Sequence, residues 1–245
     1  MKFQALSALV KMELKKLIRQ PTNLFLNLLF PAVLTIVFIF AFADPELGMS
    51  INSVVPGLIV YAVIFLILTI AQSFSSERQE GLLKRLNTTP MTSAEFMGSR
   101  IITHMLISIV QVFLVITLAY LLGFKPDNGI EGIMLAFPVT AIFALSSVGL
   151  GLITATVSKS PEVATGISFI FILPQMFFGT FIPITSTTQQ IAKLIPSYYL
   201  LDALRMIFEG DWTNANIILN LGVISTVSIS VVIIGILLFE KYGSA

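Results

Sequence analysis

The chain has 245 residues, of which 56% are hydrophobic and only 11% charged, and its mean hydropathy is +0.95. Soluble domains carry about 25% charged residues, so this composition excludes an ordinary soluble protein and indicates an integral membrane protein. A net charge of +1 gives no basic excess for binding nucleic acid, and the absence of cysteine excludes disulfides, thiol catalysis and thiolate metal sites. We expect one membrane domain, residues 1–245, because no polar stretch is long enough for a separate aqueous domain.

Residues 1–20 are predicted to form an amphipathic helix that lies on the membrane surface. Its apolar residues recur at steps of three and four, and its basic residues form a stripe beside them. The apolar set is Phe3, Leu6, Val10, Leu14 and Leu17, and the basic set is Lys11, Lys15 and Arg19. Two compatible interpretations stay open: the helix anchors the chain on anionic lipid, or it also braces a cytoplasmic partner.

Six runs without charge follow, and each exceeds the ~20 residues that a helix needs to cross the hydrocarbon core. Backbone polar groups in lipid must be satisfied within the segment, so we expect helices. The predicted spans are residues 22–42, 54–75, 98–122, 132–157, 162–181 and 214–239. The fifth is the least regular, because Pro174, Gly179 and Pro183 interrupt it.

The end of the first span, Ala41-Phe42-Ala43, resembles a signal-peptidase site. The apolar run before it is longer than the ~7–15 residues of a signal-peptide core, and an amphipathic segment precedes that run. We therefore expect the first span to be retained as a membrane helix.

A charged segment, residues 75–100, separates the second and third spans. Glu80 precedes Lys84 by four residues, the favourable order on a helix, so we predict a short cytoplasmic helix at residues 76–90. Its apolar side consists of Leu82, Leu83 and Leu86. The alternative, a solvated loop that only connects two spans, stays open.

A second unusual segment, residues 182–211, precedes the last span. Its prolines bracket a short helix-like stretch, and Tyr198 lies near the start of a second one in which Asp202 and Arg205 share a helical face. Aromatic residues with a few charges suit the membrane interface. We expect two short external helices here, with an ordinary extracellular loop as the alternative.

The basic residues predict the orientation. With six spans both chain ends lie on one side, and eleven of the fourteen lysines and arginines fall on that side. The positive-inside rule then places both termini and residues 75–100 on the cytoplasmic side. We expect the membrane to be the cell (plasma) membrane.

The chain lacks the residues that would supply energy or catalysis. It has no phosphate-binding G-x-x-x-x-G-K-[ST] loop, and no aspartate lies in the predicted spans. His104, near the cytoplasmic end of the third span, is more typical of packing than of proton transfer. We therefore predict no catalytic residue and no metal site, which argues against a membrane-embedded enzyme. Any uphill transport must then be driven by another polypeptide on the cytoplasmic side.

Two segments resemble the type-2 (exporter) permease family of ABC transporters. The first comprises Glu77, Glu80-Gly81, Leu83-Lys84-Arg85-Leu86, Thr89-Pro90 and Glu95-Phe96-Met97-Gly98. The second comprises Pro196, Tyr198, Asp202-Ala203, Arg205, Phe208 and Gly210. Two positions depart from the family pattern, since Leu82 replaces a common threonine and Ile195 replaces the usual asparagine.

The resemblance implies an all-α integral membrane protein with six transmembrane helices. It implies that residues 1–20 form the elbow helix, residues 76–90 the coupling helix, and residues 182–211 external re-entrant helices. The residues implied to contact an ATPase are Glu77, Glu80, Gly81, Leu82, Leu83, Lys84, Arg85 and Leu86. Those implied to shape the external helices are Pro196, Tyr198, Asp202 and Arg205.

The resemblance also implies partners. Members typically pair two permease copies, in contact through the first and fifth spans, with two ATPase subunits. This chain would bind no cofactor itself, because ATP and Mg²⁺ would be held by the ATPase.

The substrate is the least determined feature of the sequence. Twenty phenylalanines against one tryptophan favour a hydrophobic or amphipathic substrate, such as a drug, an antibiotic or a lipid-like molecule. Candidate residues of its path are Phe38, Phe169, Phe177 and Phe178. A polysaccharide exporter and a membrane scaffold or immunity protein that does not transport are the alternatives.

Overall fold

The computed structural model describes residues 3–19, 21, 25–43, 50–81, 93–181, 185, 188–211 and 214–242. In these residues all regular structure is helical, and none of it is a β-strand. The expected all-α membrane architecture is therefore confirmed.

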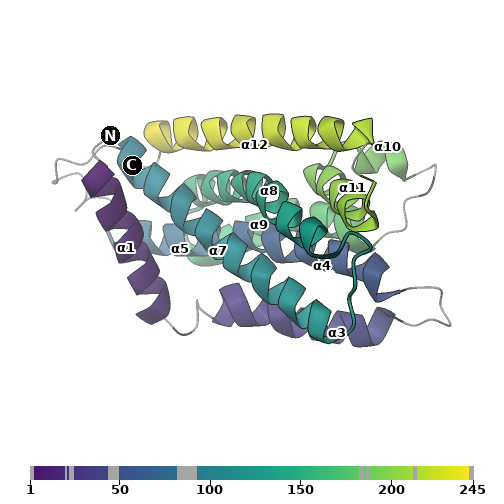
Figure 1. Ribbon diagram of the computed structural model, residues 1–245. Coiled ribbons are helices and arrows are strands. Elements are labelled where there is room, and N and C mark those ends of the chain that lie inside the picture. Colours follow the sequence, from purple (N-terminus) through teal and green to yellow (C-terminus); the bar gives the residue numbers. More distant parts are fainter. Residues whose placement is uncertain are drawn as a thin grey trace.

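Figure 1 shows the arrangement of the helices. In chain order they are α1 (Phe3–Arg19), η1 (Phe25–Leu29), α3 (Phe30–Phe42), α4 (Ile51–Ile64), α5 (Leu66–Gln79), α7 (Ser93–Leu121), α8 (Gly129–Val157), α9 (Pro161–Met176), η3 (Phe177–Phe181), α10 (Gln189–Ala192), α11 (Pro196–Glu209) and α12 (Ala215–Tyr242).

Five stretches of the described chain are long and apolar enough to cross a membrane, so this is a multi-pass membrane protein. They are Ile51–Gln79, Glu95–Leu121, Gly129–Val157, Pro161–Gly179 and Ala215–Phe239. The first expected span is shorter, because α3 has only thirteen residues. The π-helical turn η1 adds five residues directly before α3, and the two together approach the ~20 residues of a sixth span.

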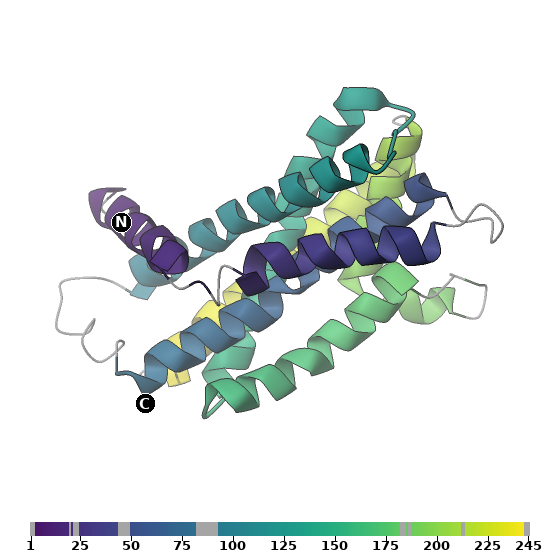
Figure 2. The same ribbon diagram turned by 90° about the horizontal axis from the view of Figure 1, so that it is seen from below.

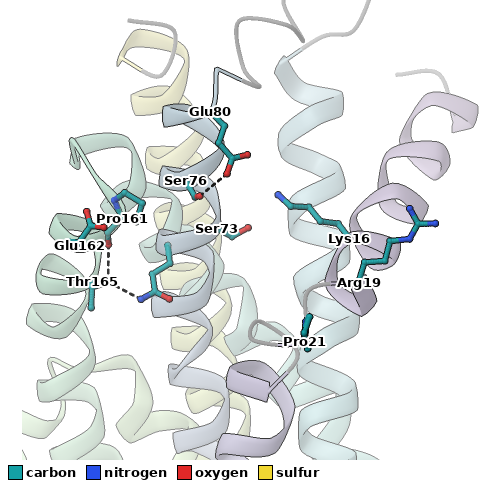
Figure 3. A pocket seen from close by; sticks show the side chains of 10 residues that line it. Lys16, Arg19, Pro21, Ser73, Ser76, Glu80, Pro161, Glu162 and Thr165 are labelled. Carbon is teal, nitrogen blue, oxygen red and sulfur yellow. Dashed lines mark hydrogen bonds between the residues drawn. The ribbon is translucent and has the colours of Figure 1, made fainter.

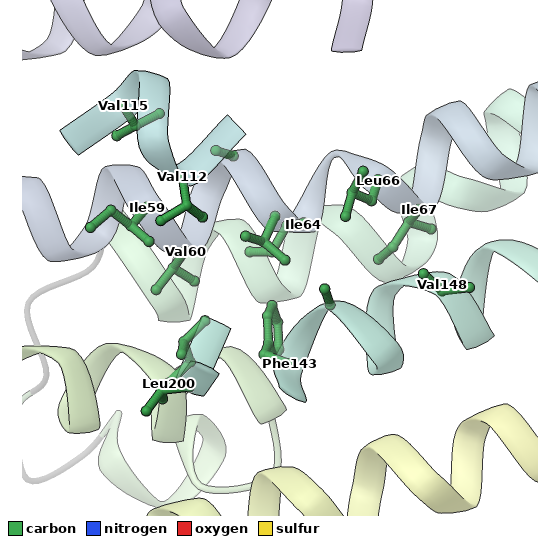
Figure 4. Packing of buried hydrophobic residues seen from close by; sticks show 14 of the residues in the cluster. Ile59, Val60, Ile64, Leu66, Ile67, Val112, Val115, Phe143, Val148 and Leu200 are labelled. Atoms are coloured by element: carbon green, nitrogen blue, oxygen red, sulfur yellow. The ribbon is translucent and has the colours of Figure 1, made fainter. Parts of the chain in front are cut away.

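The core of the bundle surrounds α4 and α5. Within the most apolar stretch of this pair, 83% of the residues are buried inside the bundle, against 17% for α12. Figure 4 shows α4 and α5 in the middle, with side chains of α7, α8 and α11 packed around them. The central residues include Ile59, Val60, Ile64, Leu66 and Ile67. The outer helices, α12 above all, therefore present most of their apolar surface to lipid or to another chain.

Glycines set the spacing of α8 between α5 and α12. A Cβ atom on Gly149 would lie 2.8 Å from Val231 Cγ1, and one on Gly151 would lie 2.8 Å from Ile70 Cβ. Both distances are too short for real side chains, so both glycines are required for close approach. Small residues at such crossings are the usual means by which membrane helices pack, since lipid supplies no hydrophobic drive between them.

The fifth span is irregular where the sequence predicts it. Pro174 lies near the end of α9, and the chain then continues in the π-helical turn η3. Proline removes a backbone donor and disturbs the preceding turn, which explains the change of helix type. The hydroxyl of Ser197, at the start of α11, donates to the carbonyl of Gln175 at 2.9 Å. The end of α9 is thereby joined to α11.

Two short helices, α10 and α11, precede α12. The second ends at Gly210, whose φ of +78° is the left-handed conformation that glycine adopts without strain. The Asp211 amide donates to the Met206 carbonyl at 3.0 Å and closes the helix end. In the bundle α11 packs against α12, α8 and α4.

The start of α1 and the end of α12 lie at the same end of the bundle, as an even number of spans requires (Figures 1 and 2). At this end, hereafter the α1 end, α1 crosses the spans at a steep angle and packs against α7 (Figure 2). The helices α10 and α11 lie at the opposite end (Figure 1).

Candidate functional site

Four charged side chains from three helices meet at the α1 end. Glu13 and Lys16 lie one turn apart on α1, Glu77 lies in the last turn of α5, and Arg100 lies in the second turn of α7. Arg100, Glu13 and Glu77 are 2%, 7% and 1% exposed, so three of the four charges are removed from water. We call these four residues the ion cluster.

Arg100 is the centre of the ion cluster. Its Nη1 donates to Glu13 Oε2 at 2.5 Å, and its Nη2 donates to Glu77 Oε2. Lys16 Nζ donates to the second oxygen of Glu77. The Arg100 guanidinium also lies 5.1 Å from the centre of the Phe96 ring, a cation–π distance. The planar fork of arginine suits this task, because it can join two carboxylates from different helices at once.

Burial makes the ion cluster energetically sensitive. Moving a charge out of water is costly, and the attraction between partners repays that cost only when every charge is paired. Two polar atoms of the ion cluster are unpaired: Glu13 Oε1 and Arg100 Nε have no hydrogen-bond partner among the residues that the structure describes. Burial raises the pKa of Glu13 above its ordinary value and Glu77 raises it further, while Arg100 and Lys16 act in the opposite direction. Ionisable groups in such positions mark functional sites in membrane proteins.

The same turn of α5 is tied to the other side of the bundle by Arg78. Its Nη1 donates to the Thr156 carbonyl in the last turn of α8 at 2.9 Å, and its Nη2 donates to the Tyr242 carbonyl at the end of α12 at 3.5 Å. Helix C-termini carry unpaired carbonyls and partial negative charge, so an arginine is a favourable partner. The last turn of α5 therefore contacts α1, α7, α8 and α12.

A polar pocket of about 540 Å³ lies beside the ion cluster, between α1, α5 and the start of α9 (Figure 3). Its α1 wall carries the cations Lys16 and Arg19, and the α5 and α9 walls carry Glu80 and Glu162. Gln72 Nε2 donates to Thr165 Oγ1 at 2.9 Å and joins α5 to α9 at its floor. The pocket is thus an opening lined by charges of both signs, next to the point where the chain leaves α5.

The structure revises the role expected of Glu77. Residues 76–79 continue α5, and the Glu77 carboxylate faces inward to Arg100. Glu77 was expected to contact a partner on the surface, but a side chain that is 1% exposed cannot do so in this conformation. The physical reason is the buried guanidinium of Arg100, which requires an anionic partner.

The other residues expected to contact an ATPase lie at or beyond the end of α5. Glu80 is exposed, and Gly81 follows it with a φ of +70°, which ends the helix in the left-handed conformation. Leu82, Leu83, Lys84, Arg85 and Leu86 fall outside the described residues.

The residues predicted for the external helices lie at the other end of the bundle. Pro196 is in the first turn of α11, two residues before Tyr198. Asp202 accepts a hydrogen bond from Asn220 of α12 at 2.8 Å. Arg205 instead lines a pocket of about 440 Å³ between α11, the start of α4 and the α7–α8 connection. The two charged residues therefore have different surroundings, although they share a helix.

The four candidate phenylalanines do not form one cluster. Phe38 stacks on Phe42 and tilts against Tyr61, with ring centres 5.3 and 6.1 Å apart. Phe169 and Phe177 belong to α9 and η3, where they are 37% and 44% exposed. Phe178 is half-buried in the same turn. Phe38 thus lies on α3 and the other three on α9 and η3, and the contacts of Phe38 with Phe42 and Tyr61 do not join the two groups into a path.

Sequence reasoning missed Glu13, Lys16 and Arg100 as members of one site. One signal was available: Glu13 is the only acidic residue in the first twenty, and it shares a helical face with Leu9. A lone carboxylate on the packing face of a helix calls for a buried cation, but the sequence does not say which one.

Comparison with known proteins identifies the family. The chain matches the family described as ABC-2 type transporter over residues 4–208. It belongs to that family. The resemblance seen in the sequence is thus confirmed, and the match includes the ion cluster and α11.

Two curated relatives of this ABC-2 chain are named as permeases. A daunorubicin resistance ABC transporter permease protein of Streptomyces coeruleorubidus is 25% identical over 187 residues, which cover 75% of this chain and 66% of that protein. A probable multidrug ABC transporter permease of Escherichia coli strain K12 is 23% identical over 199 residues, which cover 77% of this chain and 51% of that protein. The chain therefore matches between about half and two thirds of the length of these relatives.

Proposed function

We propose that this chain is the permease subunit of an ATP-driven exporter, through which a separate ABC ATPase moves a hydrophobic or amphipathic compound out of the cytoplasm or the inner leaflet. The observation that carries the proposal is the ABC-2 match over residues 4–208 of a chain built from apolar helices. In this role the chain itself performs no catalysis. ATP and Mg²⁺ are bound by the ATPase.

The α1 end faces the cytoplasm in this proposal, so both termini are cytoplasmic. Eleven of the fourteen basic residues support this orientation. The same end holds the ion cluster and the segment that joins α5 to α7, which is where a cytoplasmic ATPase would bind.

The proposed assembly contains two permease copies and two ATPase subunits. The ATPase contacts the coupling helix within residues 76–90, and Leu82, Leu83 and Leu86 act as its apolar anchors. Such anchors carry most of the energy of an interface, while charges at the rim set orientation. The structure supports the location, because α5 ends at an exposed Glu80 and a left-handed Gly81.

The printed names of the relatives, daunorubicin resistance and multidrug permease, support a drug or antibiotic as substrate. The abundance of phenylalanine over tryptophan points the same way. A glycan exporter of the same family, and a scaffold or immunity protein that does not transport, remain the alternatives.

Reconstitution tests the proposal. The chain is incorporated into proteoliposomes with an ABC ATPase subunit that co-purifies with it, and ATP-dependent movement of daunorubicin is followed. We expect movement that requires both proteins and hydrolysable ATP. A glycan exporter would leave daunorubicin in place while the permease still changes ATPase turnover. A scaffold would change neither quantity, and that result would refute the proposed function.

A further inference from the structure

The segment expected to contact the ATPase joins the described structure at two points, Gly81 after α5 and Ser93 at the start of α7. Glu77 lies four residues before the first point, and Arg100 lies seven residues after the second. Their ion pair therefore links the end of α5, which leads into this segment, to the start of α7, which follows it. The ion pair and the Arg78 bonds to α8 and α12 are thus both within a few residues of the segment.

Among its described side chains, α1 has few that are fully buried. From residue 6 to residue 19, Leu9 and Glu13 are its only fully buried side chains. One buried leucine contributes little toward holding a helix of seventeen residues in one place. Half-buried Leu17 also packs on the core, and the bonds from Arg100 to Glu13 and from Lys16 to Glu77 add directed attachments of α1 to α7 and α5.

The geometry of Arg100 allows a movement of one helix to be transmitted to two others. Its two terminal nitrogens bind one carboxylate from α1 and one from α5, and its backbone belongs to α7. All three side chains are buried, so water cannot replace these bonds when the helices shift. Separating Glu13 from Arg100 would leave the Glu13 carboxylate buried without its cation, which is unfavourable.

We propose that Arg100 is a positioning residue that makes α1, the end of α5 and the start of α7 move as one rigid body during the ATPase cycle. This inference rests on the proposed function, because it assumes that a partner displaces the segment after Gly81. It assigns α1 a moving role in transport, beyond that of an anchor on the membrane surface. Arg78 connects the same turn to α8 and α12 through weaker, half-exposed bonds to carbonyls.

Distance measurement between α1 and α7 tests the rigid-body motion. The chain has no cysteine, so spin labels can be placed without background at Ser7→Cys on α1 and Leu106→Cys on α7, both exposed positions. The complex with the ATPase is compared without nucleotide and with trapped ATP. We expect the same narrow distance distribution in both states, since the two helices move together.

Variants separate transmission from simple structural support. In Glu13→Gln we expect the α1–α7 distribution to broaden when ATP is trapped, while the nucleotide-free state stays close to that of the unsubstituted chain. Lys15→Gln is the matched control, because Lys15 is an exposed neighbour that also loses one charge. It should behave like the unsubstituted chain. Broadening to the same extent in both nucleotide states would instead show that Glu13 only supports the fold, and would overturn the proposal.

A second measurement is the amount of ATP hydrolysed per daunorubicin moved. We expect this ratio to rise several-fold in Glu13→Gln and to stay unchanged in Lys15→Gln. Loss of folded protein would lower both quantities together and leave the ratio constant. An unchanged ratio in a folded Glu13→Gln variant would therefore also overturn the proposal. If that variant does not fold, Arg100→Lys replaces it, because lysine keeps the charge but cannot bridge both carboxylates in the same planar geometry.

The proposal and the proposed function fail in different ways. If the unsubstituted complex moves no daunorubicin and its ATPase is indifferent to the permease, the proposed function fails, and the inference fails with it. If transport is observed but the α1–α7 distance of the unsubstituted chain changes on ATP binding, only the rigid-body inference fails.

Discussion

Arg100 shows how one side chain can determine the arrangement of three helices. It is among the largest fully buried side chains of the described structure, and its guanidinium lies between two carboxylates. Hydrophobic residues could fill this space at least as favourably, because a buried ion pair seldom adds net stability. What the charges add is specificity, since only one register of α1 places Glu13 and Lys16 against Arg100 and Glu77.

Removing Arg100 should be strongly destabilising. Arg100→Met leaves Glu13 and Glu77 buried without their central cation, and we expect a loss of about 3–5 kcal/mol in the free energy of unfolding. Unfolding by denaturant in mixed micelles measures this loss of free energy. The control is Arg19→Met, an exposed change on α1 expected to stay within about 0.5 kcal/mol. Equal losses in the two variants would show that burial of the ion cluster is unimportant for stability.

The predicted coupling helix can be tested at single residues. Leu83→Asp places a charge where an apolar anchor is expected, whereas Lys84→Ala removes a rim charge. We expect the first change to uncouple ATP hydrolysis from transport far more than the second. Transport assays in proteoliposomes with the ATPase compare the two, and equal activity would rule out Leu83 as an anchor.

At the scale of the elements, the contact of α8 with α12 depends on the absence of side-chain atoms. Gly149 faces Val231 and the backbone of Val232, and a Cβ atom there would come within 2.8–2.9 Å of both. The carbonyl of the same glycine lies 3.2 Å from where a Cβ on Gly235 would be. Contacts of this closeness are rigid, because backbone cannot move aside as a flexible side chain can.

Gly149→Ala should therefore separate α8 from α12. We expect a loss of about 1–3 kcal/mol in the free energy of unfolding, the range for overpacking a close contact. Gly222→Ala on α12 is the control, because nothing lies within 4 Å of the added methyl group. It should be neutral or slightly stabilising, since alanine favours helix over glycine. Thermal unfolding of both variants in detergent measures the two changes in stability. An unchanged stability of Gly149→Ala would contradict the close contact of α8 with α12.

For the whole molecule, the proposed orientation makes the two ends of the bundle chemically distinguishable. Lys11 is exposed on α1, and Glu131 is exposed in the first turn of α8 at the other end. Single cysteines at these sites can be labelled specifically, because the chain has none of its own.

In intact cells, a membrane-impermeant thiol reagent should label Glu131→Cys and leave Lys11→Cys unlabelled until the membrane is opened. The reverse pattern would invert the orientation. Labelling of both sites in intact cells would contradict the three spans expected between them.

The membrane helices were largely predictable, and their ends were not. Lipid offers the backbone no hydrogen-bond partners, so a long uncharged run must be helical whatever it packs against. The second span was expected at residues 54–75, yet α4 and α5 together extend from Ile51 to Gln79. The additional turn is stabilised by Glu77 and Arg78, whose partners lie on other helices. Such partners cannot be read from local sequence.

The sequence by itself determined that this protein is a bundle of membrane helices with an amphipathic first helix and a charged connection between the second and third spans. Local composition sufficed, since the bilayer acts on every segment in the same way. Only the tertiary structure decided that Glu77 faces inward, because its partner Arg100 is 23 residues away and Glu13 is 87 residues from Arg100. A buried charge requires a counter-charge, and only the packing of α1, α5 and α7 selects which one.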